Sequence, residues 1–373
     1  MAGRYPEPVM NLTRRQFIQS TGTAALAAAV LPAVAQGSRS LSVAFVGVAH
    51  IHTPSYLKLV KNHPGVRIKY VWDHDADRAA RNATAVGAAV PADLNVIWSD
   101  PEIAAVVILS ETNRHHDLVL AAAKAGKAIF AEKPLGINAR ESRDMADAIE
   151  QAGVIFTTGY FMRTDPKHLF LKSEVAKGHF GTITRVRGSN CHNGSLGGWF
   201  DKEWRWMADP EIAGVGAFGD LGTHKLDILM WLFGGIDSVT AAITPVTHRY
   251  GDCDETGEAL IRFKSGVIGT LAAGWVDIED PVKLLISGTR GHAVIFNDNL
   301  FYRSEDLPAS DSHVPWKDLP PAAPEPMEQF LDAVGGAKDE SLVSAPEAAE
   351  RVRVMMAMYE ASRKADWVKI DHS

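Results

Sequence analysis

Cysteine is nearly missing from this chain, which holds only Cys191 and Cys253 among its 373 residues. Two thiols cannot build a disulfide framework, and they neither require nor exclude an oxidising compartment. An excess of positive charge is also missing, because the formal net charge is −7. The composition therefore indicates no basic surface for nucleic acid or anionic lipid. The longest apolar run, over residues 24–34, is too short to span a bilayer, so we predict no membrane span.

The first 36 residues are typical of an export signal. Arg14 and Arg15 precede the alanine-rich run over residues 24–34, and the residues Ala33 to Ala35 offer a small-residue cleavage site. This order of parts is similar to a twin-arginine signal. The alternative is a fortuitous arginine pair before an alanine-rich arm. We expect residues 1–36 to be a signal peptide and the protein to be periplasmic, or cytoplasmic if the signal is not used.

The chain has an ordinary globular composition, with 46% hydrophobic and 22% charged residues, and enough length for two domains. Residues 41–46 read as an apolar strand that runs into Gly47, a helix begins near Thr53, and a second strand over residues 66–72 leads to Asp73. A dinucleotide site needs this order of elements. The helix N-terminus would hold the pyrophosphate. Asp73 would accept hydrogen bonds from the adenosine ribose and favour NAD over NADP, because a carboxylate repels a 2′-phosphate.

The glycine fingerprint of such sites is incomplete, because only Gly47 remains of G-x-G-x-x-G. Two histidine pairs, His50 with His52 and His115 with His116, suggest a metal. Neither pair has an acid or cysteine cluster at a recognisable ligand spacing, so we predict no metal. We expect His50 and His52 to lie beside the phosphates or to face the substrate cleft.

A later strand over residues 128–131 ends in Glu132, Lys133 and Pro134. In isolation, a Lys-Pro pair is most simply a turn. However, an α/β sheet binds ligands beyond the carboxyl ends of its strands. Because proline restricts the preceding residue, Lys133 would stand over the ligand with little conformational freedom.

Taken together, these motifs resemble the Gfo/Idh/MocA family of sugar and polyol oxidoreductases. They are Gly47 in its turn, Asp73, the helix start from Asn113 to His116, and the Glu-Lys-Pro element, in this order and at this spacing. Residues 159–163, Gly-Tyr-Phe-Met-Arg, look like the segment by which family members enter their second domain. The match extends over about residues 41–370. The predicted cofactor contacts are Gly47, Ala49, His50, Ile51, Asp73, Ser110, Asn113, His116, Glu132 and Lys133.

The resemblance implies an α/β protein with an NAD-binding Rossmann domain over residues 41–160. A second α+β domain, over residues 161–373, would carry an open and mostly antiparallel sheet, as the alternating apolar residues after position 236 also indicate. Its C-terminal helix, over about residues 346–365, is expected to pack back on the first domain. Family members use one face of the sheet to associate, so we expect a homo-oligomer, a dimer or tetramer.

Acid–base chemistry is expected from a glycine-rich helix start that contains Asp220 and His224. Side chains four residues apart share one face of a helix. A neutral imidazole suits removal of a hydroxyl proton while hydride leaves the same carbinol carbon. The resemblance implies that His224 is the base, Asp220 its carboxylate neighbour, and Lys133 the group that binds the reacting hydroxyl.

Three further residues are candidate substrate contacts. Arg163 could clamp substrate hydroxyls, or pair with an acid where the domains join. His192 and Asn193 resemble substrate-contact positions of polyol dehydrogenases in the family, although polar loop residues would look the same. With Asp220 and His224, they complete the predicted substrate site.

The predicted function is oxidation of a secondary hydroxyl of a sugar, glycoside or cyclitol by NAD. Free NAD should be scarce outside the cytoplasm, so an exported enzyme would keep its cofactor bound and recycle it. One scheme oxidises one sugar and reduces another. A second is a redox-neutral NAD-dependent glycosidase that oxidises a glycoside transiently, eliminates the aglycone and restores the hydroxyl. The remaining alternative, a non-catalytic sugar-binding or sensor protein, has no need of Lys133, Asp220 and His224 together.

Overall fold

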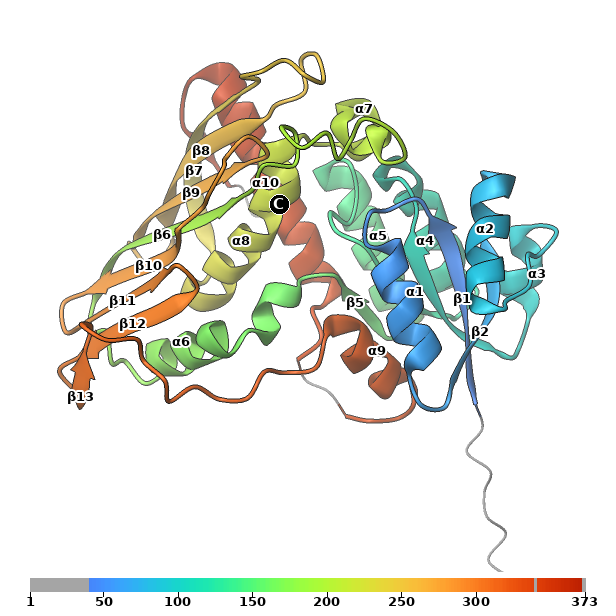
Figure 1. Ribbon diagram of the computed structural model, residues 1–373, viewed down its shortest axis with the longest axis horizontal. Coiled ribbons are helices and arrows are strands. Elements are labelled where there is room, and N and C mark those ends of the chain that lie inside the picture. Colours follow the sequence, from blue (N-terminus) through green and yellow to red (C-terminus); the bar gives the residue numbers. More distant parts are fainter. Residues whose placement is uncertain (1–39, 339–340, 371–373) are drawn as a thin grey trace, which may run out of the picture. The chain divides into compact units, whose positions relative to one another are not determined.

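The computed structural model describes residues 40–338 and 341–370. The predicted signal over residues 1–36 lies outside the described residues. In the described part, no helix has both the length and the apolar character needed to cross a membrane. Two sheets organise it, one of five strands and one of nine (Figure 1).

The five-stranded sheet is parallel throughout, with strand order β2-β1-β3-β4-β5. Its central strands are unbroken apolar runs because helices cover both faces of the sheet. The predicted Rossmann arrangement is therefore confirmed. The strands are β1 (Leu41–Val48), β2 (Val66–Trp72), β3 (Ile103–Leu109), β4 (Ala128–Ala131) and β5 (Phe156–Thr158). The helices are α1 (Thr53–Asn62), α2 (Ala76–Val86), α3 (Leu94–Ser99), the 3-10 helix η1 (Thr112–Arg114), α4 (His115–Lys124) and α5 (Ala139–Ala152).

The nine-stranded sheet has the order β13-β12-β11-β10-β6-β9-β8-β7-β14, and only its β6–β9 pair is parallel. The predicted mostly antiparallel sheet is thus confirmed. It consists of β6 (Ile183–Cys191), β7 (Ile236–Thr244), β8 (Thr256–Phe263), β9 (Ile268–Gly274), β10 (Val282–Gly288), β11 (Gly291–Phe296), β12 (Asn299–Ser304), β13 (Leu307–Asp311) and β14 (Val368–Lys369). The other elements are η2 (Phe161–Thr164), α6 (Pro166–Ala176), η3 (Arg205–Ala208), α7 (Pro210–Ala213), α8 (Ala217–Phe233), α9 (Pro326–Val334) and α10 (Ala345–Lys364).

Helix α8 is buried on nearly all sides, because it packs against β6, β8 and β9 of the large sheet and against α10. Its first turn is capped from outside the helix, since the Asp254 carboxylate accepts a hydrogen bond from Phe218 N at 2.8 Å. It ends at Gly234, which has a φ of 87°. A buried helix tolerates polar side chains only where they find partners. Asp220, His224 and Asp227 on this helix therefore call for explanation.

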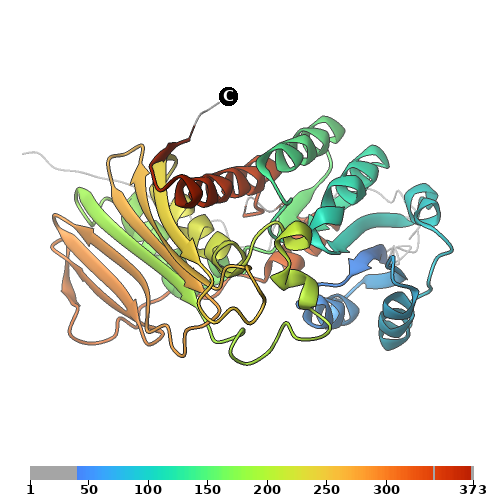
Figure 2. The same cartoon turned by 90° about the horizontal axis from the view of Figure 1, so that it is seen from above.

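Helix α10 connects the two sheets, as Figure 2 shows. It begins at a capping box formed by Ser344 and Glu347. Its first turns contribute Ala345, Ala348 and Val352 to the core on one face of the parallel sheet, and later turns pack against β7 and α8. The C-terminal helix thus lies against α5 of the first domain.

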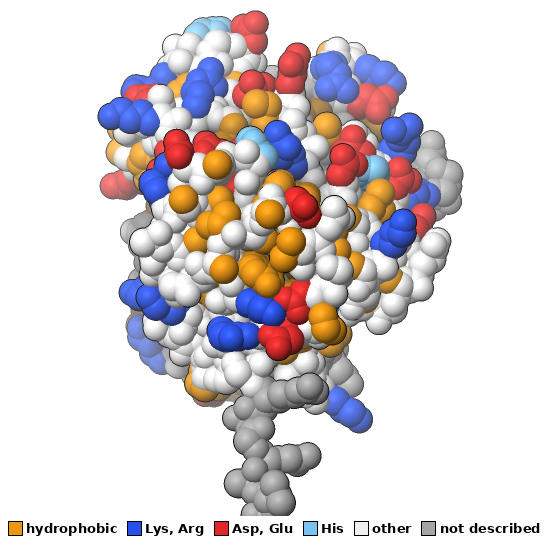
Figure 3. All heavy atoms as spheres, turned by 90° about the vertical axis from the view of Figure 1, so that its right-hand side faces the viewer, with side chains coloured by type: hydrophobic (Ala, Val, Ile, Leu, Met, Phe, Trp, Pro, Cys, Tyr) orange, Lys and Arg blue, Asp and Glu red, His pale blue; other side chains and the backbone are white. Residues whose placement is uncertain are grey.

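The surface of the first domain has charges of both signs. On the face shown in Figure 3, Lys and Arg alternate with Asp and Glu, and one-sign patches do not form. Such a face provides no basic track of the kind that binds nucleic acid.

Candidate active site

The turn after β1 is shaped by a close approach to β3. Gly47 has a φ of 84°, and a Cβ on it would lie 2.5 Å from the Cβ of Ser110. Only glycine fits there. Helix α1 begins just beyond, with no side-chain cap and no acid in its first turn, and Thr53 Oγ1 is buried without a hydrogen-bond partner. Thr53 N donates to His50 O and Tyr56 N to His52 O, so the features left for a pyrophosphate are the orphaned Thr53 hydroxyl and the positive end of the helix dipole.

Gly47→Ala is expected to lower the free energy of unfolding by about 2–4 kcal/mol, because left-handed strain and overpacking against Ser110 add up. Gly65→Ala is a matched control. Gly65 also has a positive φ, 73°, but a Cβ there would meet nothing within 4 Å. Urea unfolding of both variants measures the difference. Equal losses would show that Ser110 does not press on this turn.

Asp73, the predicted ribose contact, is held by groups of the protein itself. Its carboxylate is 0% exposed and accepts hydrogen bonds from Val48 N at 2.7 Å, Asp75 N at 2.9 Å and Arg78 at 2.7 Å. The loop amides and the Arg78 guanidinium, five residues on, use both carboxylate oxygens, and the ribose contact stays a prediction. Asp73 instead holds the β1 turn to the end of β2.

Sequence reasoning missed the acid that lies nearer to solvent at this edge, Glu111. It comes after β3 as Asp73 comes after β2, which was the available signal. Its carboxylate contacts Arg78 at 2.8 Å and His74 at 3.0 Å. Burial would raise the pKa of Glu111, but the contacts with His74 and Arg78 lower it below the ordinary value. Two carboxylates thus share one arginine here, which opposes a cofactor carrying an extra phosphate.

Lys133 and Asp220 bring the two domains together. The Lys133 ammonium lies 2.6 Å from Asp220 Oδ1 and 3.3 Å from the Asp220 carbonyl oxygen. The other carboxylate oxygen of Asp220 accepts a hydrogen bond from Trp275 at 3.2 Å. Burial would raise the pKa of Asp220, but the lysine lowers it to about 2, so the pair is ionised at neutral pH.

His224 lies one turn after Asp220 and is 3% exposed. Its ring packs against Phe161, with centroids 4.9 Å apart, and against Tyr160 at 6.1 Å. Nδ1 is buried and has no hydrogen-bond partner. Burial and the nearby Lys133 ammonium lower the pKa of His224 well below its ordinary value, against the opposing effect of Asp220. The imidazole is therefore neutral at pH 7 and has a ring nitrogen available for a proton.

Two histidines, His50 and His52, lie next to Glu132, which is fully buried. Its carboxylate accepts hydrogen bonds from His52 Nδ1 at 2.7 Å and from Lys133 N at 2.6 Å. The His50, His52 and Glu132 ligand atoms lie within 4.8 Å of one another, close enough for a metal. The folded chain thus supplies the acid that was not apparent near this pair in the sequence. Burial lowers the pKa of His50 to about 3 despite Glu132, so His50 is neutral.

The remaining predicted cofactor residues lie around the same edge of the parallel sheet. Ser110 is buried against Gly47, whereas Asn113 is exposed on η1. Ala49 accepts a hydrogen bond from Trp206 of the second domain at 3.2 Å. Ile51 packs against the core of the second domain.

His116 is not part of this group. It lies on the outer side of α4, with Nδ1 3.2 Å from Asp117 and Nε2 3.7 Å from Asp144 of α5. The buried histidine is its neighbour His115, whose nitrogens contact the carbonyl oxygens of Leu135 and Ser110. The cofactor contact predicted for His116 stays a prediction.

Arg163 does not reach the catalytic group either. Its guanidinium binds Asp227 through Nε at 2.8 Å and also contacts Glu347 at 3.1 Å. Arg351 of α10 reaches the same Asp227 carboxylate at 3.0 Å. The alternative interpretation, an arginine that pairs with an acid where the domains join, is the one that the structure shows.

His192 and Asn193 come after β6, near the catalytic group. His192 stacks on Trp199, with centroids 4.7 Å apart, and its Nδ1 accepts a hydrogen bond from Gly194 N. Burial lowers its pKa, and Asp220 and Lys133 are among the charges that act on it. Asn193 is exposed in the next turn. Of the two, His192 lies closer to the Lys133–Asp220 pair.

Comparison with known proteins places this geometry among oxidoreductases. Residues 41–160 match the oxidoreductase-family NAD-binding Rossmann fold of GFO/IDH/MocA proteins, and residues 168–294 match a C-terminal domain of the same family. A levoglucosan dehydrogenase of Pseudarthrobacter phenanthrenivorans is 29% identical over 229 residues, 55% of this chain and 58% of the relative. The scyllo-inositol 2-dehydrogenase (NAD(+)) of Bacillus subtilis is 31% identical over 221 residues, 58% of this chain and 61% of the relative. Each alignment thus leaves out more than a third of the relative.

Solved structures share the fold over most of the chain. Levoglucosan dehydrogenase in complex with NADH and levoglucosan has a TM-score of 0.74 at 23% identity, covering 89% of this chain and 100% of that one. An oxidoreductase domain protein from Kribbella flavida has a TM-score of 0.75 at 20% identity, with the same coverage. Both family models identify the same family, and the solved structures share the fold. The chain belongs to the Gfo/Idh/MocA family of oxidoreductases, and its cofactor is NAD.

Proposed function

We propose that this protein is an NAD-dependent dehydrogenase that oxidises a secondary hydroxyl of a sugar, glycoside or cyclitol. The observation that carries the proposal is the 2.6 Å contact between Lys133 and Asp220, one helical turn from a neutral His224. It joins the end of the cofactor domain to the helix that would bear the base. The names of the relatives, a levoglucosan and an inositol dehydrogenase, support this substrate class.

Each residue has a distinct task in this scheme. Bound NAD would supply the hydride acceptor, held at its pyrophosphate by the start of α1 beside Gly47. Lys133 donates a hydrogen bond to the carbinol oxygen and stabilises the negative charge that develops there. His224 takes the hydroxyl proton at a ring nitrogen, leaving a ketone once the hydride departs. Asp220 holds the lysine and stabilises the imidazolium by its charge.

We also propose that NAD stays bound between turnovers, because the twin-arginine pattern predicts a compartment with little free NAD. Retention favours redox-neutral chemistry. Either a second sugar is reduced after the first is oxidised, or a glycoside is oxidised, loses its aglycone and regains its hydroxyl. In both schemes, the hydride is returned within the cycle.

The test is to purify the full chain without added cofactor and to measure its native mass, then its turnover of a panel of sugars, glycosides and cyclitols. We expect one dinucleotide per chain and turnover of at least one compound. His224→Ala should lower that rate by about 10²- to 10⁴-fold while ligand affinity is kept. Protein without nucleotide would refute retention. Failure of wild-type protein to turn over a sugar that it binds would instead favour a sensor.

A further inference from the structure

A cavity of about 360 Å³ lies beside the catalytic helix, between α6, β6 and β10. Phe161 connects it to the proposed active site, because its ring both packs on His224 and lines this cavity. Lys225, the next residue on α8, also lines it. Asn190 does so from β6, and its side chain donates a hydrogen bond to Leu221 O of α8 at 2.9 Å. The cavity is thus built on the same helix as the base.

Lys225 is the unusual residue of this cavity. It is 1% exposed, and among the described residues no side chain or backbone group forms an ion pair or hydrogen bond with its ammonium. Its stem passes directly over Gly188 of β6, where a Cβ would lie 2.6 Å from Lys225 Cγ. The fold therefore leaves room for this side chain at a cost, since a buried charge without a partner is strongly unfavourable.

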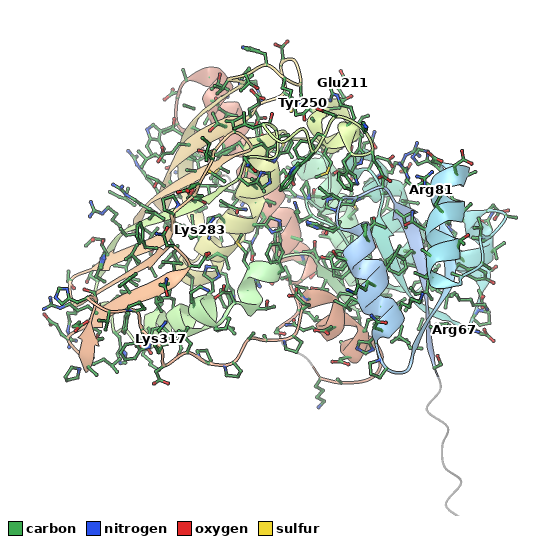
Figure 4. The ribbon with its side chains drawn as sticks, viewed as in Figure 1. Arg67, Arg81, Glu211, Tyr250, Lys283 and Lys317 are labelled. Carbon is green, nitrogen blue, oxygen red and sulfur yellow. The ribbon has the colours of Figure 1, made fainter. Side chains whose placement is uncertain are left out.

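The neighbouring cations are already paired. Lys283, labelled in Figure 4, lies 3.3 Å from Asp280, and Lys167 lies 3.0 Å from Asp165. Three members of these pairs, Asp280, Lys283 and Asp165, are the charges that act most strongly on the Lys225 ammonium. The remaining charges on the cavity wall, Asp298 and Glu325, are acidic and exposed. Within residues 40–338 and 341–370, Lys225 is therefore the one cation of the cavity wall without an ion-pair partner, and it is buried whereas the two unpaired acids are exposed.

A second side chain also lacks a partner within the described part of the chain. His168 is 5% exposed, lines the cavity, and has a buried Nε2 without a hydrogen bond. Its Nδ1 donates to the carbonyl oxygen of Met162 at 2.8 Å, so Nε2 is an acceptor. An occupant that satisfies both groups must present a negative oxygen to Lys225 and a hydroxyl donor to His168.

We propose that this cavity is a substrate subsite and that it receives a carboxylate, so that the enzyme acts on a sugar acid such as a hexuronate or aldonate, or on its glycoside. This inference rests on the proposed function, because it extends the substrate from the hydroxyl beside His224 into the cavity. One free ammonium balances one carboxylate charge. A phosphate dianion would need a second cation, and Lys167 and Lys283 are occupied. A sugar acid also carries a hydroxyl next to its carboxylate, and this hydroxyl would donate a hydrogen bond to His168 Nε2.

The test measures binding rather than turnover. Full-length protein saturated with NADH is titrated by calorimetry with hexuronates and aldonates and with the neutral sugars of matching configuration. We expect at least one acid to bind about tenfold more tightly than its neutral counterpart. Lys225→Met should abolish this preference, weakening the acid about 10- to 100-fold, as for a charge-assisted hydrogen bond, with little effect on the neutral sugar.

Lys124→Met is the matched control, because Lys124 is exposed on α4, and it should retain the preference. If Lys225→Met does not fold, Lys225→Gln keeps a polar end group without the charge and is read in the same way. Neutral sugars binding as tightly as acids, or an acid preference that survives loss of Lys225, would overturn the subsite. The turnover panel reports separately on the dehydrogenase proposal, so an acid preference without turnover would support the subsite while refuting the activity.

Discussion

Lys133→Met is expected to lower kcat/KM for alcohol oxidation by about 10³- to 10⁴-fold. The lysine supplies the charge that stabilises the developing alkoxide, and loss of a preorganised donor of this kind costs about 10²- to 10³-fold. Misplacement of the hydroxyl relative to His224 adds to the loss. Steady-state kinetics on any substrate found in the turnover panel measures the effect. A variant that keeps kcat/KM within tenfold of the wild type would contradict the role assigned to Lys133.

The same substitution also removes half of a buried ion pair. Asp220 is 8% exposed, and Trp275 would be its remaining hydrogen-bond donor. Breaking such a pair from one side costs about 3–5 kcal/mol of stability. The double variant Lys133→Met/Asp220→Asn should recover most of this stability without recovering activity, because no charge is left unpaired. That outcome separates the catalytic role of the lysine from its structural one.

Lowering the pH from 7 to 5 is expected to reduce the free energy of unfolding by about 2 kcal/mol for each of two buried histidines, His50 and His168, with a further loss from His224. Burial lowers the pKa values of His50 and His168 to about 3, and that of His224 well below ordinary. Each imidazole is neutral in the folded protein but takes up a proton near pH 6.5 when unfolded. The stabilisation is therefore complete above pH 6.5 and is lost as the pH falls toward the folded-state value. The combined loss from His50 and His168 is about 4 kcal/mol at pH 5.

Urea unfolding at pH 7 and pH 5 measures this loss directly. His168→Leu should remove about 2 kcal/mol of the difference between the two pH values, because it deletes one of the neutral buried groups. His116→Ala is the control, since this histidine is partly exposed at the α4–α5 contact, and it should leave most of the difference in place. Equal pH dependence in wild type and His168→Leu would show that His168 is not the neutral buried group described here.

The sequence predicted the parts of the site that local rules determine. Apolar runs alternating with helices identify the parallel sheet, and the carboxyl end of its fourth strand places Lys133 at the ligand edge. A spacing of four on one helix places Asp220 and His224 on one face. These inferences depend on geometry within single elements or on a general property of parallel sheets.

The features that could not be predicted depend on partners far along the chain. Arg163 is held by Asp227, 64 residues later, and by Glu347, 184 residues later. Glu111 and Arg78, from two different segments, decide how Asp73 is used. His116 is held by Asp144 of the following helix, 28 residues later. In each case, a competing interaction captured a side chain that the sequence alone left free to face the ligand.

The shared carboxylate of Asp227 has a consequence for how the cofactor could leave. Asp227 is 1% exposed and receives one arginine from the segment that joins the domains and another from α10, the helix that packs on α5. A hinge motion that separated the domains would pull these cations away from a carboxylate with no access to water. Such a motion costs several kcal/mol and is therefore rare. Exchange of a dinucleotide by this route would be slow, which supports the proposed retention of NAD.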